Sequence, residues 1–265
     1  MHIAVIGATG DLGRRVAAEA LGSGHPVAGF SRSGQPHPGV DASAAVALAA
    51  LDAGDPEAVA AVAAGSDLVI GCARPPHALV EQSAPVLRTT AGLLDGCATA
   101  GTPLLLVGGC GSLRSPNGPA LSAVDDPTVV PDQWRPIAHA CKEQWELCRD
   151  HPWRGWTHIC PPAILAPGVR TGGYLRGRDT VLVDRDGGSR ISMEDFAIAM
   201  LDEAERPRAV GDRFTVVGFP EGHRDECGGA GIPATPENSR EHTGYTPENA
   251  LGNPPGNRTS GGGAR

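Results

Sequence analysis

The sequence has little of what binding to nucleic acid or to a membrane requires. Aromatic residues make up only 4% of the 265 residues, and the formal net charge is −8. A surplus of negative charge disfavours a nucleic-acid surface, because such a surface sets basic side chains against phosphates. No run approaches the ~20 apolar residues of a membrane-spanning helix. We therefore expect no nucleic-acid partner and no membrane.

The spacing of the cysteines and the scarcity of lysine are also informative. The seven cysteines lack the spacing of zinc ligands, so we expect no metal site and no disulfide framework. We expect instead buried or partly buried thiols in a reducing cytoplasm. The chain opens with a strand pattern and not with a signal peptide, which also favours a cytoplasmic location. Lys142 is the single lysine among 22 basic residues. The cysteines are Cys72, Cys97, Cys110, Cys141, Cys148, Cys160 and Cys227.

Short apolar runs alternate with helical patterns along the first 160 residues. Strands are predicted at 1–6, 26–30, 46–51, 68–72, 103–107 and 157–160, with helices after residue 13 and over 55–64, 78–100 and 137–149. Strands that are apolar throughout are typical of a parallel sheet covered by helices on both faces. The sequence therefore predicts an α/β, Rossmann-like, doubly wound sheet. A polar loop is expected over 110–135.

The last third of the chain has a different character. Residues 161–220 predict a small substrate-side lobe without a core of its own, with a helix over 192–205 and a strand over 213–217. Residues 221–265 are rich in polar residues, glycine and proline, and too poor in apolar residues to offset the entropy of ordering. We expect a disordered tail there; a regulatory or interaction role is the alternative.

Residues 7–13 read Gly-Ala-Thr-Gly-Asp-Leu-Gly, between a strand and a helix. Glycines at this spacing permit a tight turn, close approach of the backbone to a diphosphate, and close packing of the helix on the sheet. The helix N-terminus then offers free N–H groups to the phosphates. This pattern favours dinucleotide binding, and a tight turn without a ligand is the alternative. The expected contacts are Gly7, Thr9, Gly10, Asp11, Leu12 and Gly13.

The end of the second predicted strand bears on the choice of nucleotide. Sites that prefer NAD place an acidic residue here, whereas an arginine meets the 2′-phosphate of NADP. This chain has Ser31 and Arg32 at that point and no acidic residue. NADP(H) is therefore the predicted cofactor, with NAD(H) as the second possibility. In the alternative interpretation, Arg32 is a solvated loop residue.

Residues after the other strands complete the expected nucleotide site, because ligands of such sheets bind beyond the carboxyl ends of the strands. Asp52 follows the third predicted strand and is placed to face the adenine ring. Cys72 and Ala73 follow the fourth and are expected to border the ribose on the nicotinamide side.

Several motifs in order resemble one family. They lie at 7–13, at 107–113 (Val-Gly-Gly-Cys-Gly-Ser-Leu), at 161–163, at 167–172 and at 189–197. The pattern is similar to the atypical short-chain dehydrogenase/reductase proteins, in the group of NAD(P)H–flavin reductases and NmrA-like proteins. The resemblance covers about residues 1–219 and implies an NAD(P)-binding Rossmann domain over 1–220. It is less specific for a reaction, since one fold hosts many functions.

The resemblance also points to the catalytic residues, and one is missing. Short-chain dehydrogenases use serine with tyrosine and lysine four residues apart on a helix; here Ala138 stands at the tyrosine position and Lys142 at the lysine position. Ser112 follows the fifth strand and is the candidate serine, with loop capping as its alternative. His139 is a candidate acid in place of tyrosine, or a structural residue. Tyr174 is expected to enter the pocket from the second lobe.

The predicted function is transfer of hydride from NAD(P)H to a small flavin-, quinone- or enone-like acceptor, such as FMN, riboflavin or a quinone. Hydride transfer to a stacked flavin depends mainly on proximity and orientation, so it tolerates the missing tyrosine. The alternatives are a non-catalytic NADP(H)-binding sensor and a biosynthetic tailoring reductase or isomerase. We expect a monomer or a homodimer.

Overall fold

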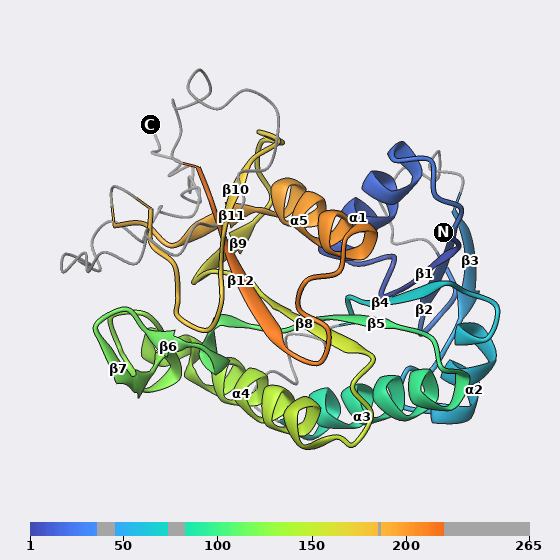
Figure 1. Ribbon diagram of the computed structural model, residues 1–265, viewed down its shortest axis with the longest axis horizontal. Coiled ribbons are helices and arrows are strands. Elements are labelled where there is room, and N and C mark those ends of the chain that lie inside the picture. Colours follow the sequence, from blue (N-terminus) through green and yellow to red (C-terminus); the bar gives the residue numbers. More distant parts are fainter. Residues whose placement is uncertain (36–45, 74–82, 185–186, 220–265) are drawn as a thin grey trace, which may run out of the picture.

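The computed structural model of the protein describes residues 1–35, 46–73, 83–184 and 187–219. Its centre is an eight-stranded sheet in the order β10-β12-β8-β5-β4-β1-β2-β3, in which only β10 is antiparallel to its neighbour (Figure 1). The strands are β1 (Ile3–Ile6), β2 (Val27–Ser31), β3 (Ala47–Ala50), β4 (Leu68–Gly71), β5 (Leu104–Val107), β8 (Trp156–Cys160), β10 (Tyr174–Gly177) and β12 (Arg213–Gly218). The predicted doubly wound sheet is confirmed.

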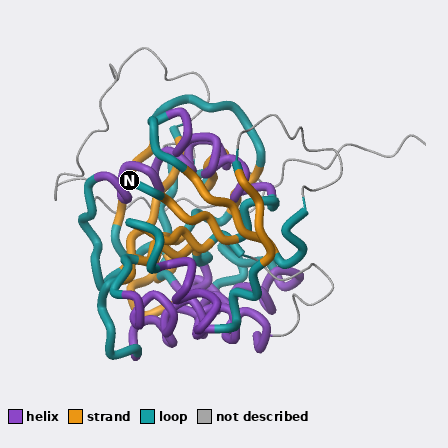
Figure 2. The backbone as a smooth tube through the Cα atoms, turned by 90° about the vertical axis from the view of Figure 1, so that its right-hand side faces the viewer, coloured by secondary structure: helices purple, strands orange, loops and turns teal. Residues whose placement is uncertain are grey.

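Helices cover both faces of the sheet. Helices α1 (Asp11–Gly22) and α5 (Met193–Glu205) lie on one face, and α2 (Pro56–Ala63), α3 (Ser83–Ala100) and α4 (Arg135–Asp150) lie on the other (Figure 1). Viewed from the side, the sheet runs between these two helical layers (Figure 2). None of the described helices has the length and apolar character that crossing a membrane requires.

The sheet divides the apolar core in two. Successive residues of β1 point to opposite faces, so Ile3 and Val5 join the cluster under α1 and α5, while Ala4 and Ile6 join the cluster against α2, α3 and α4. All four residues of β1 are buried. This double burial explains why the central strands read as uninterrupted apolar runs.

Residues 110–135 differ from the predicted loop. They form the short helices η2 (Cys110–Ser112), η3 (Ala123–Asp125) and η4 (Asp132–Trp134) and the hairpin of β6 (Arg114–Ser115) and β7 (Gly118–Ser122). Asp126 is the buried centre of this region: its carboxylate accepts hydrogen bonds from Ser115, Asn117 and Thr128. The prediction was wrong because side-chain bonds of this kind leave no periodic pattern in the sequence.

The predicted helix and late strand of the last third are present as α5 and β12. Strand β12 pairs with β8 in the central sheet, and Phe196 of α5 belongs to the core cluster shared with α1. Two further short strands, β9 (Ile164–Ala166) and β11 (Arg190–Ser192), pair with each other in parallel. The predicted tail at 221–265 and the start of the helix predicted at 78–100 lie outside the described residues.

Candidate nucleotide and acceptor site

The strand order reverses between β1 and β4, and the glycine loop lies at this point. From β1 the chain continues to β2 on one side, whereas β4 and β5 extend the sheet on the other. Gly7 has φ +87°, and a Cβ on it would lie 2.8 Å from the Ala73 nitrogen and 2.8 Å from the Cys72 carbonyl carbon. The loop therefore lies directly against the chain after β4. The structure brings these predicted site residues together at the switch point, where sheets of this kind bind ligands.

The first turn of α1 begins without a side-chain cap. Gly10 is the N-cap residue and supplies no side-chain hydrogen bond. A Cβ on Gly13 would overlap the carbonyl oxygen of Gly7, so the helix approaches the loop as closely as a glycine allows. The first-turn amides of an uncapped helix are open donors at its positive end. Asp11 is exposed beside them, Thr9 is half-buried, and Leu12 packs against the core.

The end of β2 lies next to the glycine loop. Phe30 accepts hydrogen bonds from the amides of Gly7 (2.7 Å) and Ala8 (3.1 Å), which fixes the spacing between the two segments. The Ser31 hydroxyl accepts from the Gly34 amide at 3.1 Å. Arg32 is exposed, and within the described residues its guanidinium has no hydrogen bond or ion pair. The arginine proposed to hold a 2′-phosphate is thus not committed to any described protein group.

Asp52 follows β3 and is bound to α3. Its carboxylate accepts from both terminal nitrogens of Arg88 (2.6 and 3.1 Å) and from the Gly54 amide at 2.9 Å. The hydrogen bond from Arg88 holds the pKa of Asp52 below its usual value. The pair is exposed to solvent. Asp52 is therefore ionised at neutral pH, and its predicted contact with adenine stays a prediction.

Ser112 ends η2 and is buried. Its Oγ donates to the Gly109 carbonyl oxygen at 3.1 Å and lies 3.4 Å from the Cys160 sulfur. The guanidinium of Arg213 donates to the Ser112 carbonyl and stacks 4.4 Å from the Trp145 ring centroid. The serine predicted to hold a substrate carbonyl therefore has its hydroxyl hydrogen bonded inward.

A chain of neutral polar groups continues below Ser112. Cys160 Sγ lies 3.3 Å from Nδ1 of His158, and Nε2 of that ring lies 3.4 Å from the Gln144 amide oxygen. Because an amide oxygen only accepts, Nε2 carries the proton and Nδ1 accepts from the thiol. Burial, with a smaller contribution from Arg213, lowers the pKa of His158 to about 3. The ring is therefore neutral at physiological pH.

Sequence reasoning did not find this cluster. Every residue of β8 is buried, so no period-two pattern distinguishes His158 from its apolar neighbours. Gly108 gives one retrospective signal: a Cβ there would overlap the His158 ring. Gly108 thus makes room for the buried histidine, and Gly109 makes room for Cys141 of α4. The role of Gly108 could be recognised only by knowing that β5 and β8 are neighbours.

Helix α4 shows what replaces the missing tyrosine. Ala138 is buried, and a Cβ on Gly111 would overlap its carbonyl oxygen. The helix and η2 are thus in close contact at the position where the family carries a phenol. Lys142 lies one turn further along α4 and is half-buried, whereas His139 is exposed.

Tyr174 and Arg170 are bound to helices. The Tyr174 hydroxyl donates to Asp202 of α5 at 2.8 Å, and burial together with this carboxylate raises its pKa. Arg170 forms two bonds with Glu19 of α1, at 2.7 and 3.0 Å. The sequence leaves two roles open to Arg170, binding an anionic group of the substrate or tying down its own loop. The contact with Glu19 favours the second.

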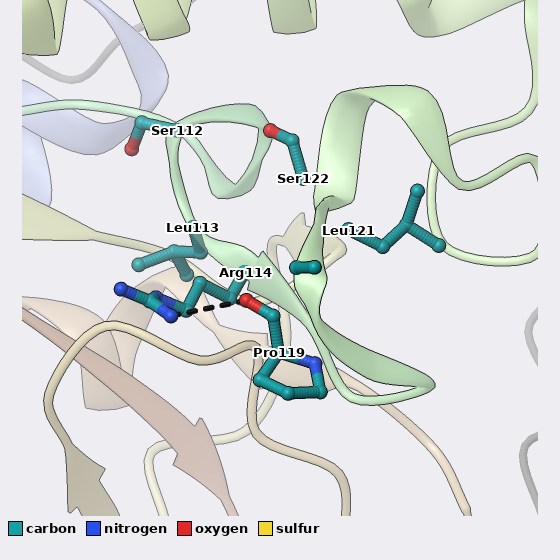
Figure 3. Close-up of a pocket in the computed structure, with 7 residues that line it drawn as sticks. Ser112, Leu113, Arg114, Pro119, Leu121 and Ser122 are labelled. Carbon is teal, nitrogen blue, oxygen red and sulfur yellow. Dashed lines mark hydrogen bonds between the residues drawn. The ribbon is translucent and has the colours of Figure 1, made fainter.

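An open pocket of about 340 Å³ lies beside Ser112 (Figure 3). The hairpin β6–β7 forms its other wall, and Arg114 donates to the Pro119 carbonyl oxygen at 3.0 Å across the hairpin. The lining residues are Ser112, Leu113, Arg114, Pro119, Ala120, Leu121 and Ser122. The lining is mixed, with one cation among apolar side chains.

The six described cysteines form no disulfide with one another and are buried or partly buried, as predicted; Cys227 lies outside the described residues. Burial raises the pKa of four of these thiols to about 12 and that of Cys160 to about 11. They are protonated at neutral pH, and a protonated thiol is a poor nucleophile. The four are Cys72, Cys97, Cys110 and Cys148.

A doubly wound parallel sheet with a glycine loop and an uncapped helix at its switch point defines a Rossmann-like nucleotide-binding protein. The chain belongs to the NAD(P)H-binding family, which matches residues 7–204. The resemblance to atypical short-chain dehydrogenases and NmrA-like proteins is confirmed, and the fold is that of NAD(P)-binding oxidoreductases.

Solved structures share the fold over most of the chain. A Burkholderia pseudomallei protein provisionally described as exported is 35% identical, with TM-score 0.70, covering 82% of this chain and 99% of its own. A Bacteroides thetaiotaomicron protein provisionally described as an epimerase is 31% identical, with TM-score 0.71, covering 84% and 99%. A Streptococcus pneumoniae protein provisionally described as an NADH-flavin reductase is 25% identical, with TM-score 0.69, covering 82% and 99%.

A curated relative of uncharacterised function is also similar. YwnB of Bacillus subtilis is 40% identical over 117 residues, which is 44% of this chain. The match spans about half of the relative, 54% of its length. The similarity to YwnB therefore gives no information about the reaction.

Proposed function

We propose that the protein is an NADPH-dependent reductase that transfers hydride to a flavin, quinone or enone acceptor. The observation that carries this proposal is the uncapped first turn of α1, set against a loop in which Gly7 and Gly13 leave no space for side chains. Such a turn offers amide donors and a positive dipole end to a diphosphate. Bound NADPH supplies the hydride, and the chain binds and orients it.

The preference for NADPH rests on Arg32. Arg32 is exposed at the end of β2, its guanidinium has no partner within the described residues, and Ser31 and Ser33 are its neighbours in the sequence. A charge-assisted hydrogen bond to a 2′-phosphate contributes about 1.5–3 kcal/mol. We expect Arg32→Ala to weaken NADPH binding about tenfold or more and to leave NADH binding unchanged. Equal affinity of this variant for NADPH would remove the preference from the proposal.

The acceptor class follows from the closed position at Ala138. No phenol stands there, and Ser112 directs its hydroxyl hydrogen to Gly109. A flavin or quinone needs little acid assistance from the protein, because the transfer depends on proximity and orientation. The relative described as an NADH-flavin reductase supports the same class.

The deciding experiment is an acceptor panel with purified protein, followed at the nicotinamide absorbance. We expect NADPH consumption with FMN, riboflavin or menadione. Tight NADPH binding without turnover of any acceptor would favour the nucleotide sensor, which the missing phenol also supports. The relative described as an epimerase favours a tailoring isomerase as the third candidate. Product formation without net consumption of nicotinamide would identify it.

A further inference from the structure

Two carboxylates at the start of α5 hold the segment between β9 and β10. Asp195 Oδ1 accepts from the amides of Thr171 (2.8 Å) and Gly172 (2.9 Å), and Oδ2 accepts from the Thr171 hydroxyl at 2.6 Å. Asp195 is only 2% exposed. These bonds fix the shape of the turn at 171–172, where Gly172 has φ +86°.

The neighbouring carboxylate, Glu194, links two different parts of the molecule. Its Oε1 accepts from Nε of Arg15 at 2.6 Å, and its Oε2 accepts from the Gly168 amide at 2.8 Å. Arg15 also donates from Nη1 to the Asp11 carbonyl oxygen at 2.7 Å. Asp11 is the first residue of α1. One carboxylate therefore connects the segment after β9 to the turn that the nucleotide phosphates are expected to meet.

The pair is well placed to keep its charge. Arg15 and Glu194 side chains are 14% and 22% exposed. Burial alone would raise the pKa of Glu194, but hydrogen bonds from Arg15 and from the Gly168 amide hold it below its usual value. The tether thus stays ionised at neutral pH. Without Glu194, the half-buried guanidinium of Arg15 keeps only the exposed Asp11 carboxylate, 3.9 Å away, and loses the close partner that fixes its position.

A second link between the same segments provides a contrast. Arg170 binds Glu19, which lies one helical turn after Arg15 on α1. The Arg170 side chain is 56% exposed and that of Glu19 is 20% exposed, and the two hydrogen bonds of the pair run to Glu19 and not to the first turn of α1. Exposed pairs contribute little, so this link fastens the segment without setting the position of the phosphate-binding turn.

We propose that Glu194 is a positioning residue of the nucleotide site, which acts through Arg15 on the first turn of α1 and couples that turn to residues 168–172. The inference rests on the proposed function, because it presupposes that the turn binds a diphosphate. Nucleotide bound at the turn orders Arg15, Arg15 orders Glu194, and Glu194 holds Gly168. Residues 168–172 are thereby set in place when the nucleotide is present.

The test compares NADPH affinity, read from nicotinamide fluorescence, among matched variants. We expect Glu194→Ala and Arg15→Met each to weaken binding about tenfold, and the double variant to be no weaker than either single one. Glu194→Gln keeps the shape and one acceptor, so it should recover part of the affinity. The control, Glu19→Gln, breaks the exposed link and should bind as the wild type does.

A second readout distinguishes positioning from simple stability. In the wild type, NADPH should slow hydrogen exchange of the amides at 168–172, and in Glu194→Ala it should not. If the wild type fails to bind NADPH, the proposed function itself fails. If it binds and Glu194→Ala binds equally well, only the tether is wrong. Should Glu194→Ala not fold, Glu194→Gln with wild-type affinity and exchange would equally overturn it.

Discussion

The carboxyl edge of the sheet has two halves whose polar groups are used differently. Beyond β1 and β2, α1 begins without a side-chain cap and Arg32 has no partner among the described residues. Beyond β5 and β8, Ser112, Cys160 and His158 bond to one another and to backbone. The first half leaves donors open, and the second satisfies its own.

The difference indicates where ligand recognition depends on the protein. Open amides and a guanidinium without a partner among the described residues favour anionic groups, since donors without partners gain the most from a ligand. The Ser112 hydroxyl already donates to a backbone oxygen, and α4 packs closely against Gly111 at Ala138. These two residues therefore contribute to the shape of the site more than to acid–base chemistry. A site that combines these two halves suits a reaction that needs orientation of the reactants and little proton transfer.

The largest effect on NADPH binding is expected from a side chain that disturbs the glycine loop at the start of α1. In Gly13→Ala the new Cβ would overlap the Gly7 carbonyl oxygen, so the loop must move away from the helix. We expect NADPH affinity to fall at least tenfold, about 1.4 kcal/mol, and thermal stability to fall as well. Calorimetric titration with NADPH measures the first and a melting curve the second.

The matched control is Gly22→Ala at the other end of the same helix, where a Cβ would meet nothing within 4 Å. It should leave binding unchanged and stabilise the protein by about 0.5–1 kcal/mol, because alanine favours the helix. Equal affinities for the Gly13 and Gly22 variants would contradict a phosphate site at this turn.

The half that contains Ser112, Cys160 and His158 should make the protein less stable in acid. The pKa of His158 is about 3 in the fold and near 6.5 in the unfolded chain, so the unfolded chain binds more protons between these values. Stability from the neutral ring is complete above about pH 6.5 and is lost as the pH falls toward 3. Melting temperature against pH should show a shallower acid slope in His158→Gln. The exposed His139→Gln variant should keep the wild-type slope.

Restoring the family tyrosine sharpens the comparison further. Ala138→Tyr puts a phenol where the helix contacts Gly111, and overpacking of this kind costs about 1–3 kcal/mol. We expect a lower melting temperature and no gain of ketone reduction. Glu143→Tyr, at an exposed position of the same helix, should change stability by no more than about 0.5 kcal/mol. A stable Ala138→Tyr variant that reduces ketones would show that the position is open.

Local pattern predicted the structure around residues 7–13 well. The strand, the glycine spacing and the helix start are all set by residues within thirteen positions, so residues 7–13 could be placed from the sequence. The proline-led start of α2 was equally local: Asp55 caps it through bonds to the amides of Glu57 and Ala58.

The other half depends on contacts between distant segments. The hairpin β6–β7 is centred on Asp126, and β9, β10 and β11 have only three or four residues each. The sequence indicated neither that the Ser112 hydroxyl donates to Gly109 nor that Tyr174 binds Asp202. These partners become visible only once β5, β8 and α5 are adjacent.

The smallest effect on NADPH binding is expected at Asp52, the residue predicted to face the adenine ring. Asp52 is ion-paired with Arg88, and an exposed pair contributes about 0–1 kcal/mol to stability. Asp52→Asn and Arg88→Gln both break the pair, but only the first changes the group expected to face adenine. We expect Asp52→Asn to weaken NADPH binding by about 0.5–1.5 kcal/mol, the value of one hydrogen bond, and Arg88→Gln to leave it unchanged. Titrations of both variants with NADPH and with a nicotinamide fragment that lacks adenine separate the two roles. If both variants lose the same affinity, the ion pair supports nucleotide binding, and a contact between the Asp52 carboxylate and adenine does not. Asp52 would then not belong to the group of residues that contact the nucleotide directly.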